Sequence, residues 1–89
     1  MGYNLTYSLE YSAEAVMQLE RLDRSIAKRI LKKLDSTMND PHNFFEQLTG
    51  RPEYKLRVGD YRIIANIEDS SKKILIRTIG HRKNIYDKI

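Results

Sequence analysis

The strongest structural signal in the chain lies in residues 54–64, Tyr54-Lys55-Leu56-Arg57-Val58-Gly59-Asp60-Tyr61-Arg62-Ile63-Ile64. The Gly-Asp pair near its centre separates two runs in which apolar and polar residues alternate, the pattern of two β-strands joined by a two-residue turn. This turn pairs Val58 with Tyr61 and sets Arg57 opposite Arg62. One side of the hairpin is then apolar, whereas the other side carries Lys55, Arg57, Arg62 and Asn66.

The residues after the hairpin continue the sheet. Asp69-Ser70-Ser71-Lys72 is a second turn signal, and Ile74–Ile79 alternates as a third strand that points Arg77 away from the core. Consecutive strands joined by short turns pair antiparallel, so residues 54–79 are predicted to form a three-stranded antiparallel meander. The tail, residues 80–89, follows directly.

The residues before the hairpin predict one strand and two helices. Residues 3–9 alternate as a half-buried strand does. Ser12 is a good helix N-cap, and Asp23 can cap a second helix whose apolar residues recur from Ile26 to Met38. The Asp40-Pro41 pair should end that helix, because proline disfavours a helical residue before it. Residues 42–52 are expected to be irregular.

Together these elements predict an α+β fold in a single small domain over residues 1–89. It consists of an N-terminal strand, a two-helix hairpin and the three-stranded antiparallel meander. Since almost no linker joins the helices, both are expected to lie on one face of the sheet and to leave the opposite face free.

Positive charge is concentrated in the second half of the chain. Residues 51–89 hold ten lysines or arginines and five acids, whereas residues 1–50 hold six and seven. A polyanion is the partner that this asymmetry favours, although a solvated lysine-rich surface would give the same count.

The composition excludes several classes of function. The chain has no cysteine, so it has no disulfide, thiolate zinc site or thiol nucleophile. It contains no phosphate-binding or dinucleotide-binding glycine motif, and its two histidines, His42 and His81, are far apart in sequence. No apolar stretch approaches the ~20 residues that span a bilayer. We therefore expect no cofactor, metal or membrane, and a cytoplasmic location.

Two features point to phosphate chemistry. Arg57 opposite Arg62 places like charges in direct opposition, which destabilises a hairpin, and Lys55 is on the same side. A pocket for phosphate would explain this cost, because arginine and lysine both grip phosphate oxygens. The tail then adds His81, Arg82 and Tyr86 as further candidates.

RNA cleavage would need few protein groups, because the 2′-hydroxyl is the nucleophile. The protein must help to remove the 2′ proton, stabilise the charged transition state and help the 5′-oxygen to leave. Tyr86 would serve as base only with cations beside it, whereas His81 exchanges protons near neutral pH. Taken singly, each is more often a packing or hydrogen-bonding residue.

Residues 54–64, together with Gly80-His81-Arg82-Lys83-Asn84-Ile85-Tyr86, resemble the RelE/ParE superfamily of toxins, over essentially the whole chain. The resemblance implies a RelE-like fold and a cognate RelB-like antitoxin, whose complex with the toxin is expected to bind operator DNA through the antitoxin. In the RelE branch it also implies metal-independent cleavage of mRNA in the ribosomal A site through a 2′,3′-cyclic phosphate.

The resemblance also assigns roles to residues. Lys55 would hold phosphate and help the 2′-oxygen ionise, Arg62 would stabilise the transition state, and Arg82 would support charge on the leaving side. Tyr86 would stack on a base or act as general base, with His81 as the other candidate base. Contacts to RNA or the ribosome are expected from Arg57, Arg77 and Lys83. The strand has one lysine and one arginine where the best-known RelE pattern has two lysines, which leaves the base open.

Two other functions remain open at this point. A ParE-like toxin shares the fold but poisons DNA gyrase without cutting RNA. A degenerate member would only bind its antitoxin. The convergent cations and the tail tyrosine favour the nuclease, because a gyrase binder does not need them.

Overall fold

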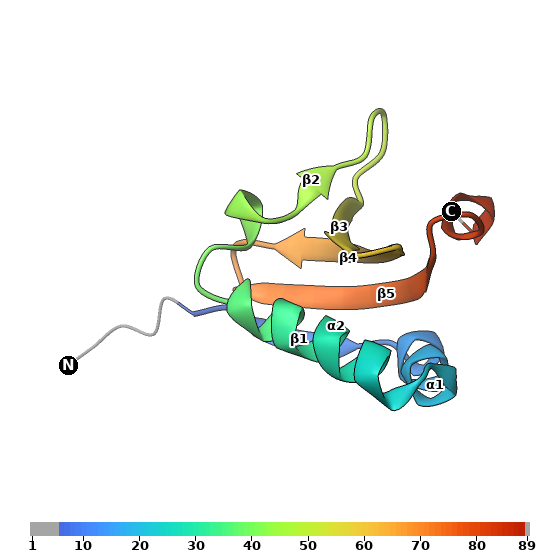
Figure 1. The fold of residues 1–89 in the computed structure, drawn as a ribbon. Coiled ribbons are helices and arrows are strands. Elements are labelled where there is room, and N and C mark those ends of the chain that lie inside the picture. The colour runs from blue at the N-terminus through green and yellow to red at the C-terminus, as the bar shows by residue number, and fades with distance from the viewer. Residues whose placement is uncertain (1–5, 89) are drawn as a thin grey trace.

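The computed structural model describes residues 6–88, in which five strands form one sheet with two helices packed on it (Figure 1). The elements in chain order are β1 (Ser8–Tyr11), α1 (Ala13–Arg21), α2 (Arg24–Ser36), the 3-10 turn η1 (Pro41–Asn43), β2 (Glu46–Gln47), β3 (Tyr54–Val58), β4 (Tyr61–Glu68), β5 (Lys73–His81) and the 3-10 turn η2 (Ile85–Lys88). The predicted α+β architecture is confirmed. No described helix is long and apolar enough to cross a bilayer.

The sheet order is β1-β5-β4-β3-β2. Its centre is the predicted meander, with Val58 opposite Tyr61 and Arg57 opposite Arg62. Gly59 has the positive φ (58°) that the tight turn requires. β1 pairs with β5 in parallel, so the sheet is mixed.

Three expectations from the sequence are corrected. Glu46 and Gln47 form the short edge strand β2, antiparallel to β3, within the stretch expected to be irregular. The first strand runs from Ser8 to Tyr11 rather than over residues 3–9, of which residues 3–5 lie outside the described residues. α2 ends at Ser36, before Asp40-Pro41, because the buried Thr37 turns its hydroxyl back to the Leu34 carbonyl oxygen at 2.7 Å.

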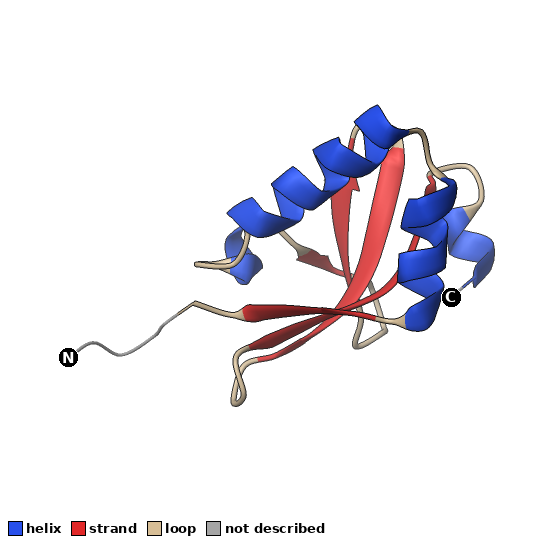
Figure 2. Ribbon diagram, turned by 90° about the horizontal axis from the view of Figure 1, so that it is seen from below, coloured by secondary structure: helices blue, strands red, loops and turns tan. Residues whose placement is uncertain are grey.

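The two helices begin as predicted. The Ser12 hydroxyl oxygen accepts the Ala15 N–H at 3.0 Å and donates to the Arg77 carbonyl oxygen at 2.7 Å, so one side chain starts α1 and ties it to β5. Asp23 stands at the N-cap of α2 but makes no side-chain capping bond. Both helices lie on the same side of the twisted strands (Figure 2).

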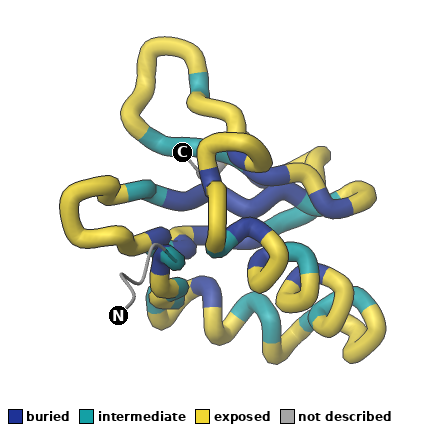
Figure 3. Tube along the Cα trace, turned by 90° about the vertical axis from the view of Figure 1, so that its left-hand side faces the viewer, coloured by how far each residue is buried: buried dark blue, intermediate teal, exposed yellow. Residues whose placement is uncertain are grey.

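The core lies between the helices and the sheet. The fully buried Ala15, Ile30 and Leu34 come from the helices. They pack against apolar residues of β3, β4 and β5, namely Leu56, Val58, Ile63, Ala65, Ile74, Ile76 and Ile79. Figure 3 shows the buried segments gathered in the central strands, with the loops exposed.

We call the side of the sheet opposite the helices the outer face. The sequence predicts that this face is free, but part of it is covered. Ile64 is buried there, opposite Lys55, and Ile85 of the tail is fully buried without belonging to the main core. A side chain added at Gly80 would meet the Ile85 Cδ1 at 3.0 Å, so Ile85 rests directly on Gly80. The tail therefore covers one end of the outer face.

At the other end of the molecule, Tyr7, His42 and Asp69 form a hydrogen-bonded cluster. The buried Tyr7 donates its hydroxyl to Asp69 Oδ1 at 2.6 Å, and His42 Nε2 lies 2.7 Å from the same oxygen. These bonds join the N-terminal segment, η1 and the β4–β5 turn. The Tyr7 hydrogen bond, with a smaller one from His42, holds the pKa of Asp69 below its usual value.

Leu34→Ala should lower the free energy of unfolding by about 2–5 kcal/mol, because it leaves a cavity in a core where Leu34 is fully buried. Leu31→Ala is the matched control on the same helix, since Leu31 is 38% exposed. It should cost within about 0.5 kcal/mol, as surface substitutions usually do. Urea denaturation of both variants measures the difference, and equal costs would contradict the described core.

Asp69→Asn should lower Tm at neutral pH, and the difference from the parent should vanish as the pH falls below about 4. The sign follows from the depressed pKa of folded Asp69. A carboxylate of this kind stabilises the fold above its unfolded-state pKa and loses that effect as the pH falls through the folded-state pKa. Thermal melts across this range measure it, with Glu20→Gln on exposed α1 surface as control. A pH-independent difference would show that the Asp69 charge is not involved.

Candidate active site on the outer face

The β3–β4 turn fixes one arginine in place. Arg62 is only 9% exposed, and its Nη1 donates to the carbonyl oxygens of Gly59 (3.0 Å) and Tyr61 (2.9 Å). A guanidinium has five N–H donors, so three remain after these two bonds. They have no hydrogen-bond partner within residues 6–88. The turn thus orients a cation and leaves most of its donors for a ligand.

Arg82 lies at the same turn. Its backbone N–H donates to the Asp60 carbonyl oxygen at 2.8 Å, and its Nε is 3.5 Å from Asp60 Oδ1. The two arginines therefore meet at the turn although they are far apart in sequence. Both side chains of this ion pair are more than half exposed, so the pair is screened and opens easily for an anionic ligand.

Lys55 and Tyr86 form the other side of the site. The Lys55 Nζ lies 6.0 Å from the centroid of the Tyr86 ring, near the outer limit of a cation–π contact. The same ammonium lies 3.7 Å from Glu46 Oε1, on the edge strand β2. Tyr86 is 45% exposed, so its ring is available to a ligand.

The packing of Ile85 against Gly80 holds the tail beside the strands that carry Lys55 and Arg62. Gly80 lies opposite Arg62 in the β4–β5 pairing, and Ile85 immediately precedes Tyr86. Figure 1 shows η2 beyond the end of β5. A buried apolar contact thus holds an otherwise exposed turn, and with it the tyrosine, beside the strands.

Four of the sequence candidates therefore gather around one end of the outer face, and we call them the outer-face site: Lys55, Arg62, Arg82 and Tyr86. Arg57 joins them, since it lies opposite Arg62 with an exposed side chain. Two separate parts of the chain supply the cations and the ring, namely the β3–β4 strand pair and the tail. Such a set can bind a phosphate and stack on a base.

The other three candidates lie apart. His81 is opposite Tyr61 on the helix-covered face, where their rings meet edge to face at 5.5 Å, and its Nδ1 accepts the Lys83 N–H at 3.2 Å. Arg77 donates to Asn66 Oδ1 at 3.1 Å, beyond the β-bulge between Ile64 and Ala65. The side chain of Lys83 is exposed in the tail.

Sequence reasoning missed the supporting residues. The sequence predicts Asp60 only as a turn residue, whereas in the structure its carboxylate also pairs with Arg82. Gly80 and Ile85 had no assigned role. Counting the register from the turn after Glu68 would set Ile79 opposite Arg62, because only the β-bulge between Ile64 and Ala65 shifts the pairing to Gly80. The return of Ile85 to Gly80 likewise shows only in the path of the tail. Among residues 6–88, no group of three His, Asp or Glu side chains could hold a metal ion.

Comparison with known proteins shows that the chain is similar to bacterial and archaeal toxins. A family model described as the ParE toxin of the type II toxin–antitoxin system parDE matches residues 9–86. The chain is 24% identical over 82 residues to a putative RelE-like toxin protein of Escherichia coli, covering 89% of this chain and 86% of that protein. It is 23% identical, with the same coverage, to the mRNA interferase toxin RelE of that species.

Solved structures agree on the fold. The RelBE2 toxin–antitoxin complex of Mycobacterium tuberculosis superimposes with a TM-score of 0.80 at 20% identity, covering 86% of this chain and 99% of that one. The archaeal RelE–RelB complex from Pyrococcus horikoshii gives 0.72 at 27% identity, covering 86% and 96%.

Gly80→Ala should disturb the tail, because the new Cβ would lie 3.0 Å from the Ile85 Cδ1. Ile85→Val removes that methyl group. The two changes should therefore be less damaging together than their separate effects add up to, with a coupling of about 0.5–3 kcal/mol between contacting residues. Urea denaturation measures the coupling, and the rate of tryptic cleavage after Lys83 reports on the tail. Strictly additive effects would show that Ile85 does not rest on Gly80.

Proposed function

The chain belongs to the RelE/ParE superfamily of toxins from type II toxin–antitoxin systems, and on that premise we propose that it is a ribosome-dependent endoribonuclease that cuts mRNA in the A site. The observation that carries the proposal is the outer-face site, where two arginines, a lysine and an exposed tyrosine converge at one end of a sheet. RelE relatives named mRNA interferases support it.

The proposed chemistry uses the substrate's own nucleophile. The 2′-oxygen loses its proton and attacks the adjacent phosphorus, the bond to the 5′-oxygen breaks, and that oxygen takes up a proton as a 2′,3′-cyclic phosphate forms. Arg62 stabilises the extra negative charge on the phosphoryl oxygens, because the turn holds it in one orientation before substrate arrives. Arg82 supports the leaving side, and Lys55 favours ionisation of the 2′-oxygen.

Tyr86 is a better candidate than His81 for a direct role at the RNA. Its exposed ring lies beside the Lys55 ammonium, whereas His81 is on the helix-covered face against Tyr61. Tyr86 stacks on a base of the bound codon or takes the 2′ proton. His81 then acts by holding the start of the tail through Lys83. Arg57, Arg77 and Lys83 supply further contacts to RNA or ribosome.

A RelB-like antitoxin is the proposed partner, as in the solved toxin–antitoxin complexes of similar fold. Val16, Met17 and Leu31 expose apolar surface on α1 and α2 that such a partner can cover. We propose the cytoplasm as the site of action, and operator binding by the complex through the antitoxin.

A ParE-like gyrase poison is the second candidate function, and the description of the matching family model favours it. It does not require the convergence of Lys55, Arg62, Arg82 and Tyr86 on one surface. A member that only binds its antitoxin would also lack this requirement.

Reconstituted translation separates the candidates. Primer extension on the message should reveal 3′ ends within A-site codons when ribosomes are present and none when they are absent. Gyrase-dependent DNA breaks in place of RNA ends would establish the ParE-like function, and neither product would leave only antitoxin binding.

Lys55→Met should slow cleavage about 10²–10³-fold, the usual effect of removing one group that stabilises transition-state charge. Lys73→Met is the matched control, because Lys73 is also a strand lysine with a carboxylate partner, its Nζ 3.5 Å from Glu10. The control should cleave at the parental rate. Equal rates for both variants would remove Lys55 from the mechanism.

Tyr86→Phe distinguishes the two roles of the ring. If the ring only stacks, Phe should retain the rate and Tyr86→Ala should lose it. If the hydroxyl takes the proton, both variants should be severely slowed. Single-turnover cleavage measures both, and full activity of Tyr86→Ala would contradict any role at the RNA.

A further inference from the structure

Arg77 lies at a point where the pairing of β5 with β4 is irregular. Ile64 pairs with Thr78 and Ala65 pairs with Ile76, so Arg77 is an extra residue on β5 and forms a β-bulge. Bulges of this kind are common beside functional sites, where they redirect one side chain. The bulge is therefore a candidate for function rather than a defect of the sheet.

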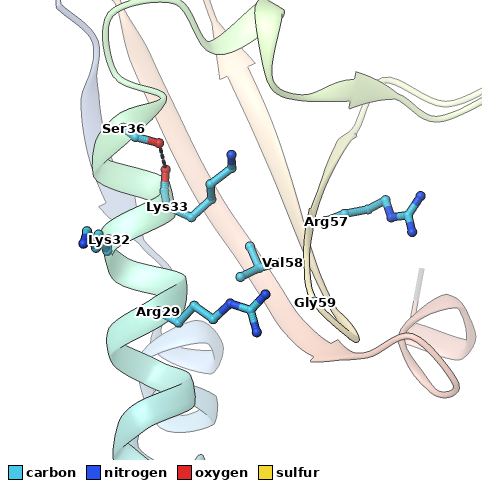
Figure 4. Close-up of a pocket in the computed structure, with 7 residues that line it drawn as sticks. All are labelled: Arg29, Lys32, Lys33, Ser36, Arg57, Val58 and Gly59. Carbon is cyan, nitrogen blue, oxygen red and sulfur yellow. Dashed lines mark hydrogen bonds between the residues drawn. The ribbon is translucent and has the colours of Figure 1, made fainter.

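The side chain of Arg77 reaches the outer face. Asn66 lies between Ala65 and Ile67, which both contact the core beneath the helices, so the Asn66 side chain is on the opposite face. Arg77 Nη1 donates to Asn66 Oδ1 at 3.1 Å. Figure 4 shows Arg57 of β3 pointing away from α2 as well. Arg77 therefore shares a face of the sheet with the outer-face site.

Side chains at the start of α1 hold the backbone of the bulge. The Ser12 hydroxyl donates to the Arg77 carbonyl oxygen at 2.7 Å. The Gln18 side-chain oxygen accepts the Ile79 N–H at 2.6 Å, and its amide nitrogen donates to the Thr78 hydroxyl at 3.0 Å. These contacts restrict the bulge before a ligand arrives, and a preorganised residue binds its ligand at a lower entropic cost.

Arg77 and Asn66 together offer a ligand almost only hydrogen-bond donors. A guanidinium has five N–H donors and no acceptor, and Arg77 uses one of them on Asn66. The Asn66 oxygen must face the arginine, so the amide turns its own two N–H donors away from it. Within residues 6–88, neither side chain has another hydrogen bond or ion pair. A ligand at this pair has to supply acceptors.

A nucleobase suits the pair better than a phosphate does. Phosphate is bound best where several free cations converge, as they do at the outer-face site. The other cations near the pair already have carboxylate partners, since Arg51 Nε is 3.1 Å from Glu53 Oε1 and Lys73 Nζ is 3.5 Å from Glu10 Oε2. The pKa of Glu53 is lowered chiefly by its hydrogen bond to Arg51 and less by the charge of Arg77, so this carboxylate lies close to Arg77. A phosphate would be repelled here, whereas an uncharged base would not.

Guanine is the base whose edge matches a set of donors. Its N7 and O6 are neighbouring acceptors, which a guanidinium binds with two parallel hydrogen bonds. Adenine presents an amino group beside N7, and cytosine presents an amino group in place of an oxygen, so a donor would face a donor. Single-stranded RNA exposes these edges to a protein.

We propose that Arg77, oriented by the bulge and by Asn66, is a specificity-determining residue that recognises a guanine of the bound RNA. This proposal rests on the proposed function in taking RNA as the ligand. Gly80, opposite Arg62, is three residues from Arg77 along β5, which is roughly 10 Å in an extended strand. At ~3.4 Å per stacked nucleotide, the guanine lies within about three nucleotides of a phosphate at Arg62.

Fluorescence anisotropy on the full chain tests the proposal with labelled 2′-O-methyl hexanucleotides, which cannot be cleaved. The RNAs are oligouridines that carry one guanine, one 7-deazaguanine or one adenine. 7-Deazaguanine keeps O6 but has a carbon in place of N7, so it lacks one of the two acceptors. The parent protein should bind the guanine RNA about 10-fold more tightly than the other two, the usual discrimination of one bidentate base contact.

Arg77→Gln should lower the ratio of guanine to adenine affinity to one or below, because an amide pairs with the N6 and N7 edge of adenine. All affinities fall with the lost charge, so the ratio is the readout. Arg24→Gln is the matched control, since it removes the same charge from an exposed position of α2 and should keep the parental ratio. Tm of Arg77→Gln should match that of the parent, because Ser12 binds the backbone of residue 77 and not its side chain.

Several results would overturn the proposal. They are equal binding of the three RNAs by the parent protein, no binding at all, or a guanine preference that survives Arg77→Gln. If Arg77→Gln lowers Tm, the comparison of guanine with 7-deazaguanine still decides, since it needs no variant.

The outcomes also separate this inference from the proposed function. A guanine preference that depends on Arg77, in a protein that cuts no ribosome-bound message, would refute the cleavage function and leave the base contact standing. Cleavage by a protein without the preference would refute only the base contact.

Discussion

The site depends on the two hydrogen bonds from Arg62 Nη1 to the carbonyl oxygens of the β3–β4 turn. They let a cation lie nearly buried beside other cations, because carbonyl dipoles offset part of the charge that burial would otherwise penalise. The turn in turn holds Arg82 through Asp60, and Gly80 opposite Arg62 provides the seat for Ile85. The β3–β4 turn thus orients both arginines, and the strand pairing beside it determines where the tail lies.

The two faces of the sheet differ in what they contribute to stability. The helix-covered face holds nearly all the apolar burial, whereas the outer face carries the like charges of Arg57 and Arg62. A domain of this size has little stability to spare, and repulsion between those charges reduces it. The Ile85 contact and the Tyr7–Asp69–His42 cluster offset this cost at opposite ends of the molecule.

The hairpin register, the helix start at Ser12 and the helix-covered face follow from local rules, since alternation, turn chemistry and capping act over a few residues. The parallel β1–β5 pairing, the edge strand β2 and the return of Ile85 to Gly80 depend on contacts between distant segments, for which local patterns carry no signal. For the same reason the sequence alone predicts His81 and Arg82 in one site, although strand alternation places His81 on the other face.

The parallel pairing of β1 with β5 also bears on how the protein is made. Within residues 6–88, the first strand, β1, pairs only with the last strand, β5, so this sheet cannot be completed until residues 73–81 have been synthesised. Arg82 and Tyr86 come later still. Non-local pairing of this kind is slow to form and follows loop closure over most of the chain. The outer-face site can therefore assemble only after β5 and the residues that follow it have been synthesised.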